Sequence, residues 1–346
     1  MERPIRRAGT VEALMPATSL RALAISVVQR LVLGLVTVWL VATISFTMAV
    51  MAPGDPVMAM LGDDGDADVR ARAARSFGTD RPAIVQYAAW MQRLARFDLG
   101  TSTSYRAPVG EVIRQRLPAT LALMLPALLL SSVLAVAFAL SASNTQAWRR
   151  SVVVSAGAVL SAIPVYVLAH GLILVFALKL QWLPMQGLGD PRSQAIGTAA
   201  VFETARYLVL PTAALTLQQL VVLWLYLRAR VAEEGRRLYM RTALAKGLSP
   251  GQAVRRHLWP NVRLGFLHFV AARSGSLLAG AVLVESVFGI AGMGRLIVSA
   301  SVARDVPLVT GIFLCVAALV VATNVAADAC TVFLDPRLEA ERPDAV

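Results

Sequence analysis

The sequence predicts an all-α, polytopic membrane protein with six transmembrane helices and with both termini in the cytoplasm. Of its 346 residues, 57% are hydrophobic and only 16% are charged, and the mean hydropathy is +0.64. This composition is far from that of a soluble globular domain. Six apolar runs are long enough to cross about 30 Å of hydrocarbon. The basic residues gather between these runs, which is the pattern that orients helices in a bilayer.

The predicted spans are the parts of the chain with long uninterrupted apolar character. Their ranges are Leu31–Met51, Leu117–Leu140, Val152–Leu178, Tyr207–Leu227, Leu264–Val287 and Val309–Phe333. Together they make one six-span membrane domain over residues 31–334. The first run is too long for the apolar part of a secretory signal, so we expect a retained helix. Residues 1–30 and 335–346 are predicted to be cytoplasmic tails.

Residues 52–116 form the longest polar segment and carry nine Arg against eight acidic residues. Because a nearly neutral loop suits the outer side, we predict that this region is external. Between Asp80 and Gly100 the apolar residues recur at helical spacing, which predicts an amphipathic helix. Such a helix would lie on the membrane or on a partner.

The middle spans are separated by one cytoplasmic and one external loop. Residues 141–150 contain Arg149 and Arg150 and are predicted to be cytoplasmic, whereas residues 179–206 are nearly neutral and are predicted to be external. Pro164 lies inside the third span and predicts a kink.

Residues 228–263, called the coupling loop below, contain nine Arg or Lys and two Glu and are predicted to be cytoplasmic. A first helix is expected up to Lys246, with Gly247 as a left-handed cap. Ser249 and Pro250 are typical of the start of a second helix, which we expect Pro260 to close. Positive charge alone explains a solvated anchor, but it does not require this helix–turn–helix pattern.

Several polar side chains inside the spans are candidates for lining a path through the membrane. They are Gln218, Gln219, Arg273, Glu285, Asn324 and Asp328. Adjacent amides on a helix point about 100° apart, so at least one of the two glutamines should face protein or water. An unpaired intramembrane charge costs about 2.5–3.5 kcal/mol, so Arg273 and Asp328 should face the bundle interior. They would either pair to hold two helices together or line the path.

No enzymatic motif is found in the sequence. A phosphate-binding G-K-S/T loop, a G-x-S-x-G motif and a helical metal-ligand motif are all absent. Cys315 and Cys330 both lie in the last apolar segment, and the three histidines are scattered, so we expect no disulfide, metal or cofactor site. The net charge of +12 is explained by orientation in the membrane, so nucleic-acid binding is not expected.

The segment Tyr239–Ser249, reading YMRTALAKGLS, resembles the cytoplasmic loop of the dipeptide, oligopeptide and nickel branch of binding-protein-dependent ABC importer permeases. Against the more general loop pattern of such permeases, only Ala243, Gly247 and Pro260 are retained. The resemblance implies contact with an ATPase for a defined set of residues. These are Tyr239, Arg241, Thr242, Ala243, Lys246, Gly247, Leu248 and Pro260.

The resemblance extends over about residues 25–338. Further similar segments are P-G-D-P at 53–56, D-L-G-T-S at 98–102, E-S-V-F at 285–288, G-M-G-R-L at 292–296, A-R-D-V-P at 303–307 and D-P-R at 335–337. It implies a multi-pass subunit of the bacterial cytoplasmic (inner) membrane that forms half of a translocation pathway. The implied partners are a second related permease, two ABC ATPase subunits, an extracytoplasmic solute-binding protein and membrane lipid.

Two functional alternatives remain open at the level of the sequence. Within the resembling family, the cargo is either a peptide or nickel and its chelates. In a different class, the chain would be a stand-alone, ion-coupled secondary transporter that uses Arg273 and Asp328 as its coupling groups.

Overall fold

The structure is a computed structural model that describes residues 17–51, 82–141, 147–190, 192–193 and 196–334. The predictions made for residues 1–16, for P-G-D-P at 53–56, for most of the loop at 141–150 and for the tail from residue 335 with its D-P-R lie outside these residues. Within the described ranges the chain is helical apart from loops and one isolated bridge between Thr101 and Pro108. The all-α prediction is confirmed for this part of the chain.

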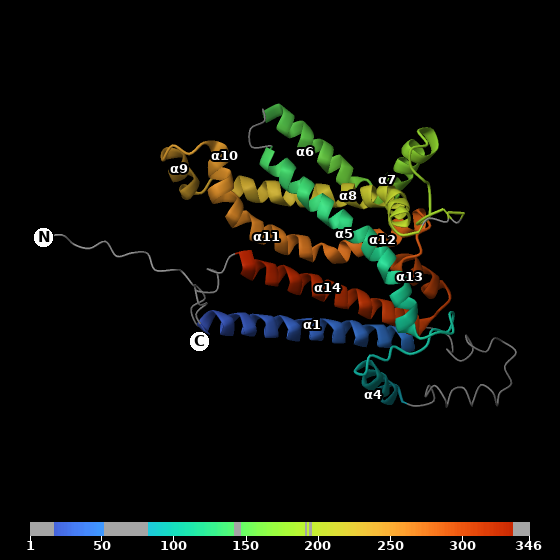
Figure 1. Cartoon of the computed structure of the whole chain (residues 1–346). Helices are drawn as coiled ribbons and strands as arrows, with labels where there is room; N and C mark the ends of the chain where they lie inside the picture. Colours follow the sequence, from blue (N-terminus) through green and yellow to red (C-terminus); the bar gives the residue numbers. More distant parts are fainter. Residues whose placement is uncertain (1–16, 52–81, 142–146, 191, 194–195, 335–346) are drawn as a thin grey trace, which may run out of the picture.

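The helices are labelled as in Figure 1. They are α1 (Ala17–Met51), α4 (Ala83–Leu94), α5 (Val109–Ser141), α6 (Ala147–Ala162), α7 (Val165–Leu172), α8 (Thr198–Glu234), α9 (Leu238–Ala245), α10 (Pro250–Ala253), α11 (Trp259–Ala272), α12 (Ser274–Val287), α13 (Met293–Val302) and α14 (Val306–Leu334). Two π-helical segments, η2 (Ile173–Lys179) and η3 (Val254–Leu258), follow α7 and α10.

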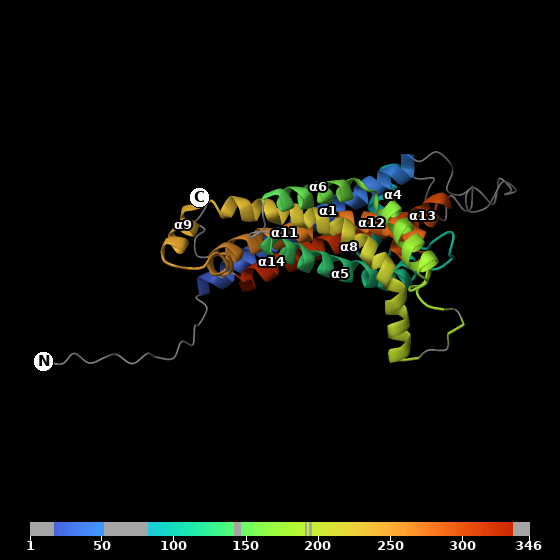
Figure 2. The ribbon, with the colours of Figure 1, turned by 90° about the horizontal axis from the view of Figure 1, so that it is seen from above.

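The long helices lie side by side in one elongated bundle (Figures 1 and 2). Helix α1 lies along α14, α14 packs on α11, and α5 packs on α8. Helix α8 is the most enclosed, because its side chains from Leu210 to Leu227 are buried or partly buried throughout. Its first residues project away from the bundle in Figure 2. The start of α1 and the end of α14 both lie at the bundle end that carries α9 and α10 (Figure 1).

Among the described residues three helices are long and apolar enough to cross a membrane, namely α5, α8 and α14. Two bent pairs, α6 with α7–η2 and α10–α11 with α12, meet the same test when each pair is taken as one span, which gives up to five. In α1, the apolar stretch Val32–Met48 is shorter. The structure thus supports several spans, while the number six and the sidedness of the termini stay predictions.

Two of the predicted spans are bent. At Pro164 the two halves of the third predicted span meet at 96°, so the predicted kink is confirmed and is large. The fifth predicted span bends by 44° at Arg273, which the sequence analysis did not foresee. Helix α8 begins at Thr198, nine residues before the predicted start of the fourth span, so that Pro211 lies inside the helix.

The expectation that Pro260 closes the second loop helix is wrong. The helix runs on from Pro250 through η3 and into α11 up to Ala272, with Pro260 in the first turn of α11. A proline ring collides with the carbonyl four residues earlier in a regular α-helix. The wider π-helical turn at Val254–Leu258 accommodates the ring, so the helix continues.

Candidate functional site

The turn between α9 and α10 has the cap geometry that the sequence predicts. Gly247 has a φ of +86°, and the Leu248 amide donates to the Ala243 carbonyl at 3.3 Å, which closes the end of α9. Ser249 then caps α10 through a reciprocal pair of hydrogen bonds with Gln252, and Pro250 occupies the first turn. Local hydrogen bonds therefore fix the shape of the turn.

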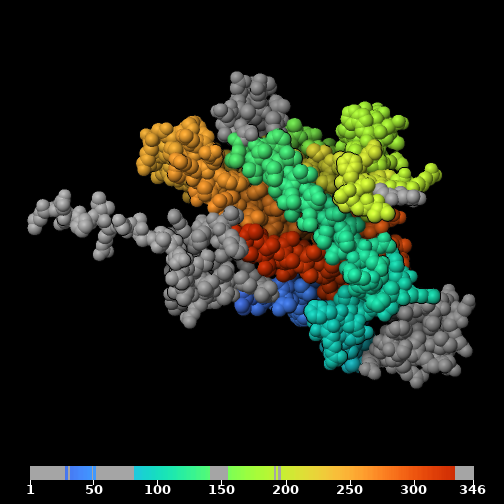
Figure 3. Space-filling view, viewed as in Figure 1, coloured from blue at the N-terminus to red at the C-terminus, as the bar shows by residue number. Residues whose placement is uncertain are grey.

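Helix α9 has a buried and an exposed face. Met240 and Ala243 are each 5% exposed and pack in a cluster with side chains of α5, α8, η3 and α11. On the other face Leu238 is 77% exposed and Leu244 is 45% exposed. The residues 241, 242, 245, 246 and 247 beside them are also exposed. Figure 3 shows the region of α9 and α10, in orange, protruding from one end of the molecule.

The eight predicted coupling residues therefore divide into two groups. Ala243, Tyr239, Leu248 and Pro260 are buried or partly buried and hold the loop against the bundle, and the Tyr239 hydroxyl donates to Glu234 Oε2 at 2.8 Å. Arg241, Thr242, Lys246 and Gly247 are exposed. The second group, with the two leucines, forms an apolar and basic surface that is free to meet another molecule.

Gln219 and Arg273 meet where α8 passes the bend between α11 and α12. The Arg273 guanidinium donates to Gln219 Oε1 at 3.1 Å, and the Gln219 amide donates to the Arg273 carbonyl at 3.5 Å. Gln219 is only 2% exposed. The two residues thus tie the bend to the central helix.

Arg273 does not pair with Asp328, so the predicted ion pair is wrong. Asp328 Oδ1 lies 2.9 Å from His268 Nε2. The other ring nitrogen, Nδ1, lies 2.9 Å from the Leu264 carbonyl oxygen, which only accepts, so Nδ1 carries a proton. Asp328 therefore joins α14 to α11 before the bend, while the Arg273 side chain turns to α8. Asn324, on the same face of α14, donates to the Val320 carbonyl.

Glu285 is wholly buried, at 0% exposure, and it fixes the start of α13. Its carboxylate accepts from Thr120 Oγ1 at 2.6 Å, from the Gly294 amide at 2.7 Å and from the Arg295 amide at 3.1 Å. The Met293 amide donates to Thr120 Oγ1 at 2.8 Å. We call these five residues the Glu285 knot. A negatively charged group is favourable at a helix N-terminus. The E-S-V-F segment supplies this group through Glu285, and the G-M-G-R-L segment supplies the helix start that it binds, so both segments have a structural role.

Asp305 plays a similar part at the start of α14, and the sequence analysis did not select it. It is 0% exposed and accepts from the Ser102 hydroxyl and from the amides of Ser104 and Leu308. Burial opposes its ionisation, but these hydrogen bonds outweigh burial and hold the pKa of Asp305 below its ordinary value. Ser102, which would be expected to be accessible in an external loop, is only 1% exposed because of this contact.

Gln218 is partly exposed and lies beside α12. Its Oε1 would be 3.4 Å from a methyl group placed on Gly280. One face of the bent helix pair beside it is exposed. The residues of this face, called the exposed stripe, are Ala272, Ser276, Ala279, Leu283 and Ser286.

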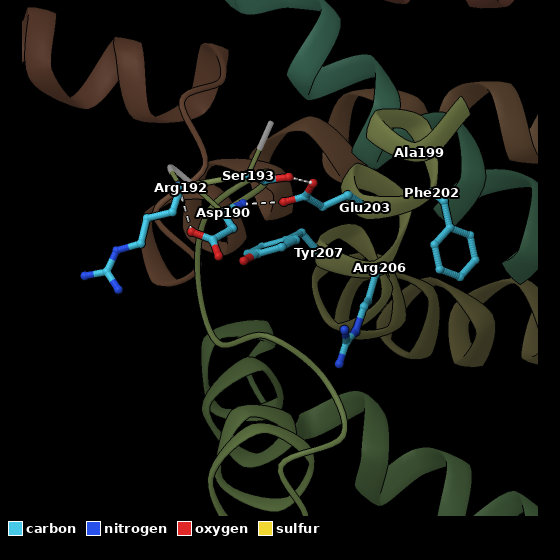
Figure 4. A pocket seen from close by; sticks show the side chains of 8 residues that line it. All are labelled: Asp190, Arg192, Ser193, Ala199, Phe202, Glu203, Arg206 and Tyr207. Atoms are coloured by element: carbon cyan, nitrogen blue, oxygen red, sulfur yellow. Dashed lines mark hydrogen bonds between the residues drawn. The ribbon is translucent and has the colours of Figure 1, made fainter. Parts of the chain in front are cut away.

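A cavity of about 400 Å³ lies at the other end of the bundle, between α8 and the loop before it (Figure 4). Glu203 accepts from the Asp190 amide at 2.7 Å and from the Ser193 hydroxyl at 2.5 Å, and Asp190 accepts from the Arg192 amide at 2.9 Å. These bonds fold the loop onto α8. No group of three or more metal-ligating side chains gathers in the described part of the chain.

Comparison with known proteins agrees with this arrangement. Residues 133–340 match the family model described as the inner membrane component of binding-protein-dependent transport systems. Residues 24–124 match the model of the N-terminal part of such membrane components. The two matches together cover most of the chain, including the coupling loop.

Individual relatives are similar over nearly their whole length. A peptide transport system permease protein of Brucella abortus (strain 2308) is 30% identical over 313 residues, covering 90% of this chain and 98% of the relative. A di/tripeptide transport system permease protein of Pseudomonas aeruginosa (strain UCBPP-PA14) is 31% identical over 336 residues, covering 91% and 99%. An oligopeptide transport system permease protein of Bacillus subtilis (strain 168) is 28% identical over 315 residues, covering 90% and 98%.

The family consists of membrane subunits and not of enzymes. The resemblance read from the coupling loop is therefore confirmed by matches that extend across the bundle. The chain belongs to the inner membrane components of binding-protein-dependent transport systems, and it is a multi-pass permease subunit of an ABC importer.

Proposed function

We propose that this chain forms one half of a pathway for peptides and that separate ATPase subunits drive it by docking on the coupling loop. The relatives are named as peptide, di/tripeptide and oligopeptide permeases, which favours a peptide over nickel or a metal chelate. The proposed assembly has a second related permease, two ATPase subunits and an external solute-binding protein.

The observation that carries the docking proposal is the exposed face of α9. Leu238 and Leu244 are exposed on a helix whose opposite face is buried, and Arg241 and Lys246 stand beside them. Exposed apolar side chains rimmed by charge on a rigid element are typical of a protein contact. The cap bonds around Gly247 keep this face in a fixed shape without a partner.

The proposed topology has six spans, formed by α1, α5, α6–α7, α8, α11–α12 and α14. An even number of spans brings both ends of the domain to the same side. The start of α1 and the end of α14 lie at the bundle end that carries α9 and α10 (Figure 1), which supports this proposal. The basic coupling loop then assigns that end to the cytoplasm, and the loops holding Asp190 and Asp305 to the outside.

The proposed pathway runs along Gln218 and the exposed stripe of α12. The amide of Gln218, which lies near Gly280 of α12, is poorly suited to lipid, because its hydrogen-bonding groups would be unsatisfied there. The stripe also contains small residues, which allow close approach of the second permease. Gln219, Glu285 and Asp328 are instead engaged within the chain, which also weakens the secondary-transporter alternative for Asp328.

The docking proposal is tested in the assembled transporter with Leu244→Ser and Gly247→Trp. The Leu244 side chain is exposed, so Leu244→Ser removes no packing within the chain. A Cβ added at Gly247 has no atom within 4 Å, but the φ of +86° at this position strains any side chain, so Gly247→Trp also disturbs the turn and Leu244→Ser is the variant that isolates the docking surface. We expect the variants to insert into the membrane but to lose bound ATPase and substrate-stimulated ATP hydrolysis. Val302→Ser, which changes an 82% exposed apolar residue at the opposite end, is the control. Normal ATPase recovery and uptake with Leu244→Ser and Gly247→Trp would refute the docking surface.

A further inference from the structure

Arg273 carries a charge that the described part of the chain does not balance. Its hydrogen bond to Gln219 Oε1 joins it to a neutral amide, and its Nε is buried without a partner. The ion pairs of the described residues join other groups, and Arg273 forms none of them. The carboxylates of the neighbouring helices, Glu285 and Asp328, are bound elsewhere.

A guanidinium inside the membrane without an anion is costly. Arginine presents five N–H donors in a planar fork that fits a carboxylate with two parallel bonds. Within the described residues the Arg273 guanidinium makes one hydrogen bond, through Nη2, which leaves Nη1 available. The Arg273 guanidinium can therefore bind an anion, and the described part of the chain does not supply one.

The surroundings of Arg273 place this anion site next to the proposed pathway. The residue is partly exposed and stands at the 44° bend between α11 and α12. Ala272 and Ser276, on either side of it in sequence, begin the exposed stripe, and Ser276 Oγ donates to the Arg273 carbonyl at 2.8 Å. Broken helices near the middle of a membrane are where transporters commonly bind the charged parts of their cargo.

We propose that Arg273, positioned by Gln219, binds the C-terminal carboxylate of a peptide as it passes the α11–α12 bend. Peptides of different sequence share their backbone and their two charged ends, so the terminal carboxylate is the anion that a pathway for varied peptides always meets. This inference rests on the proposed function. It adds a specificity-determining residue that recognises a defined group of the cargo.

The test compares two probes in proteoliposomes that contain the complete transporter and its solute-binding protein. The probes are radiolabelled trialanine and trialanine C-terminal amide, and the quantity measured is the ratio of their initial uptake rates. Any preference of the solute-binding protein for one probe is the same with every permease variant, so a change in the ratio reports on the permease alone.

With Arg273→Gln we expect uptake of the free acid to fall by on the order of tenfold or more, the loss typical of a charge-assisted bond, while uptake of the amide is unchanged. Arg273→Lys keeps a charge but loses the planar fork, so it should lower the same ratio by less. Arg273→Lys also provides the measurement if the Arg273→Gln variant fails to assemble. The matched control is Arg295→Gln, at an exposed arginine of α13 away from the stripe, and its ratio should equal that of the unchanged protein.

Two results would overturn the inference. An equal fall for both probes in assembled Arg273 variants would assign the guanidinium to helix packing or to a carboxylate of the second permease. An unchanged uptake ratio in both variants would show that Arg273 does not recognise the C-terminal carboxylate of the peptide. If the unchanged transporter takes up neither probe although loaded binding protein stimulates its ATPase, then the peptide assignment fails, and this inference fails with it.

Discussion

Replacing Gly292 with alanine should destabilise the chain through one contact, the carboxylate of Glu285. Gly292 has a φ of −102°, which any residue adopts, so the change brings no backbone strain. An added Cβ would lie 2.4 Å from Glu285 Cδ and 2.4 Å from its Oε1. Because carbon atoms in contact stand about 3.5–4.0 Å apart, the carboxylate must move by roughly 1 Å.

The expected magnitude follows from the bonds that this movement breaks. The carboxylate is held by Thr120 at 2.6 Å, by the Gly294 amide at 2.7 Å and by the Arg295 amide at 3.1 Å. A shift of about 1 Å takes at least two of these bonds beyond useful length. Hydrogen bonds to a charged group contribute about 1.5–3 kcal/mol each, so we expect Gly292→Ala to lower the free energy of unfolding by about 3–5 kcal/mol.

The assay is a denaturant titration of the detergent-purified chain, followed by tryptophan fluorescence, in a double-mutant cycle with Glu285→Ala. Removing the carboxylate removes the collision, so the double variant should be no less stable than Glu285→Ala alone. Gly110→Ala is the control, since no atom lies within 4 Å of its added Cβ and it sits in the first turn of α5. It should be neutral or stabilising by up to about 1 kcal/mol.

Either of two results would refute this reasoning. A Gly292→Ala chain within about 0.5 kcal/mol of the unchanged protein would mean that the carboxylate moves without cost. Simple addition of the Gly292 and Glu285 effects in the double variant would mean that the two residues do not interact.

Three further predictions concern charge and exposure. The low pKa of Asp305 means that its charged form stabilises the fold above the ordinary aspartate pKa of about 3.9 and that this contribution is lost as pH falls through the lower folded pKa. The stability difference between the unchanged chain and Asp305→Asn should thus be largest near about pH 6 and shrink below about pH 3.9, and a difference independent of pH would contradict it. Exchanging the pair as His268→Asp with Asp328→His should restore thermal stability that either single change loses, because the two side chains are in direct contact at 2.9 Å; a double variant as unstable as the worse single one would exclude a mutual pair. Ser104→Cys should react with a membrane-impermeant thiol reagent in sealed cells whereas Ser249→Cys should not, and labelling at Ser249 would reverse the proposed sidedness.

The features that were predictable from the sequence are those set by near neighbours. The turn at Gly247 and the cap at Ser249 depend on hydrogen bonds that span three to five residues, so the local residue types are enough to predict both features. Apolar run length likewise predicted the long helices α5, α8 and α14.

The features that were missed depend on residues that are far apart or on local backbone adjustment. Glu285 meets Thr120 across 165 positions of sequence, so its role as a helix cap was not visible and it was taken for a pathway residue. Arg273 was considered as a partner of Asp328 because two basic side chains, His268 and Arg273, lie on the same span, and only the bend decides which one faces α14. Pro260 was taken as a helix end because a π-helical turn has no distinctive residue pattern.

The unbroken passage of the chain through Pro260 has a mechanical consequence. From Pro250 to Ala272 the backbone is one continuous helix, about 34 Å long at 1.5 Å per residue. A stop at Pro260 would have left a loose joint that absorbs movement. A continuous rod instead acts as a lever, so that a tilt of about 5° imposed at one end displaces the other end by about 3 Å. A subunit that pushes on α10 therefore moves Arg273 directly, with no intermediate step of folding or repacking.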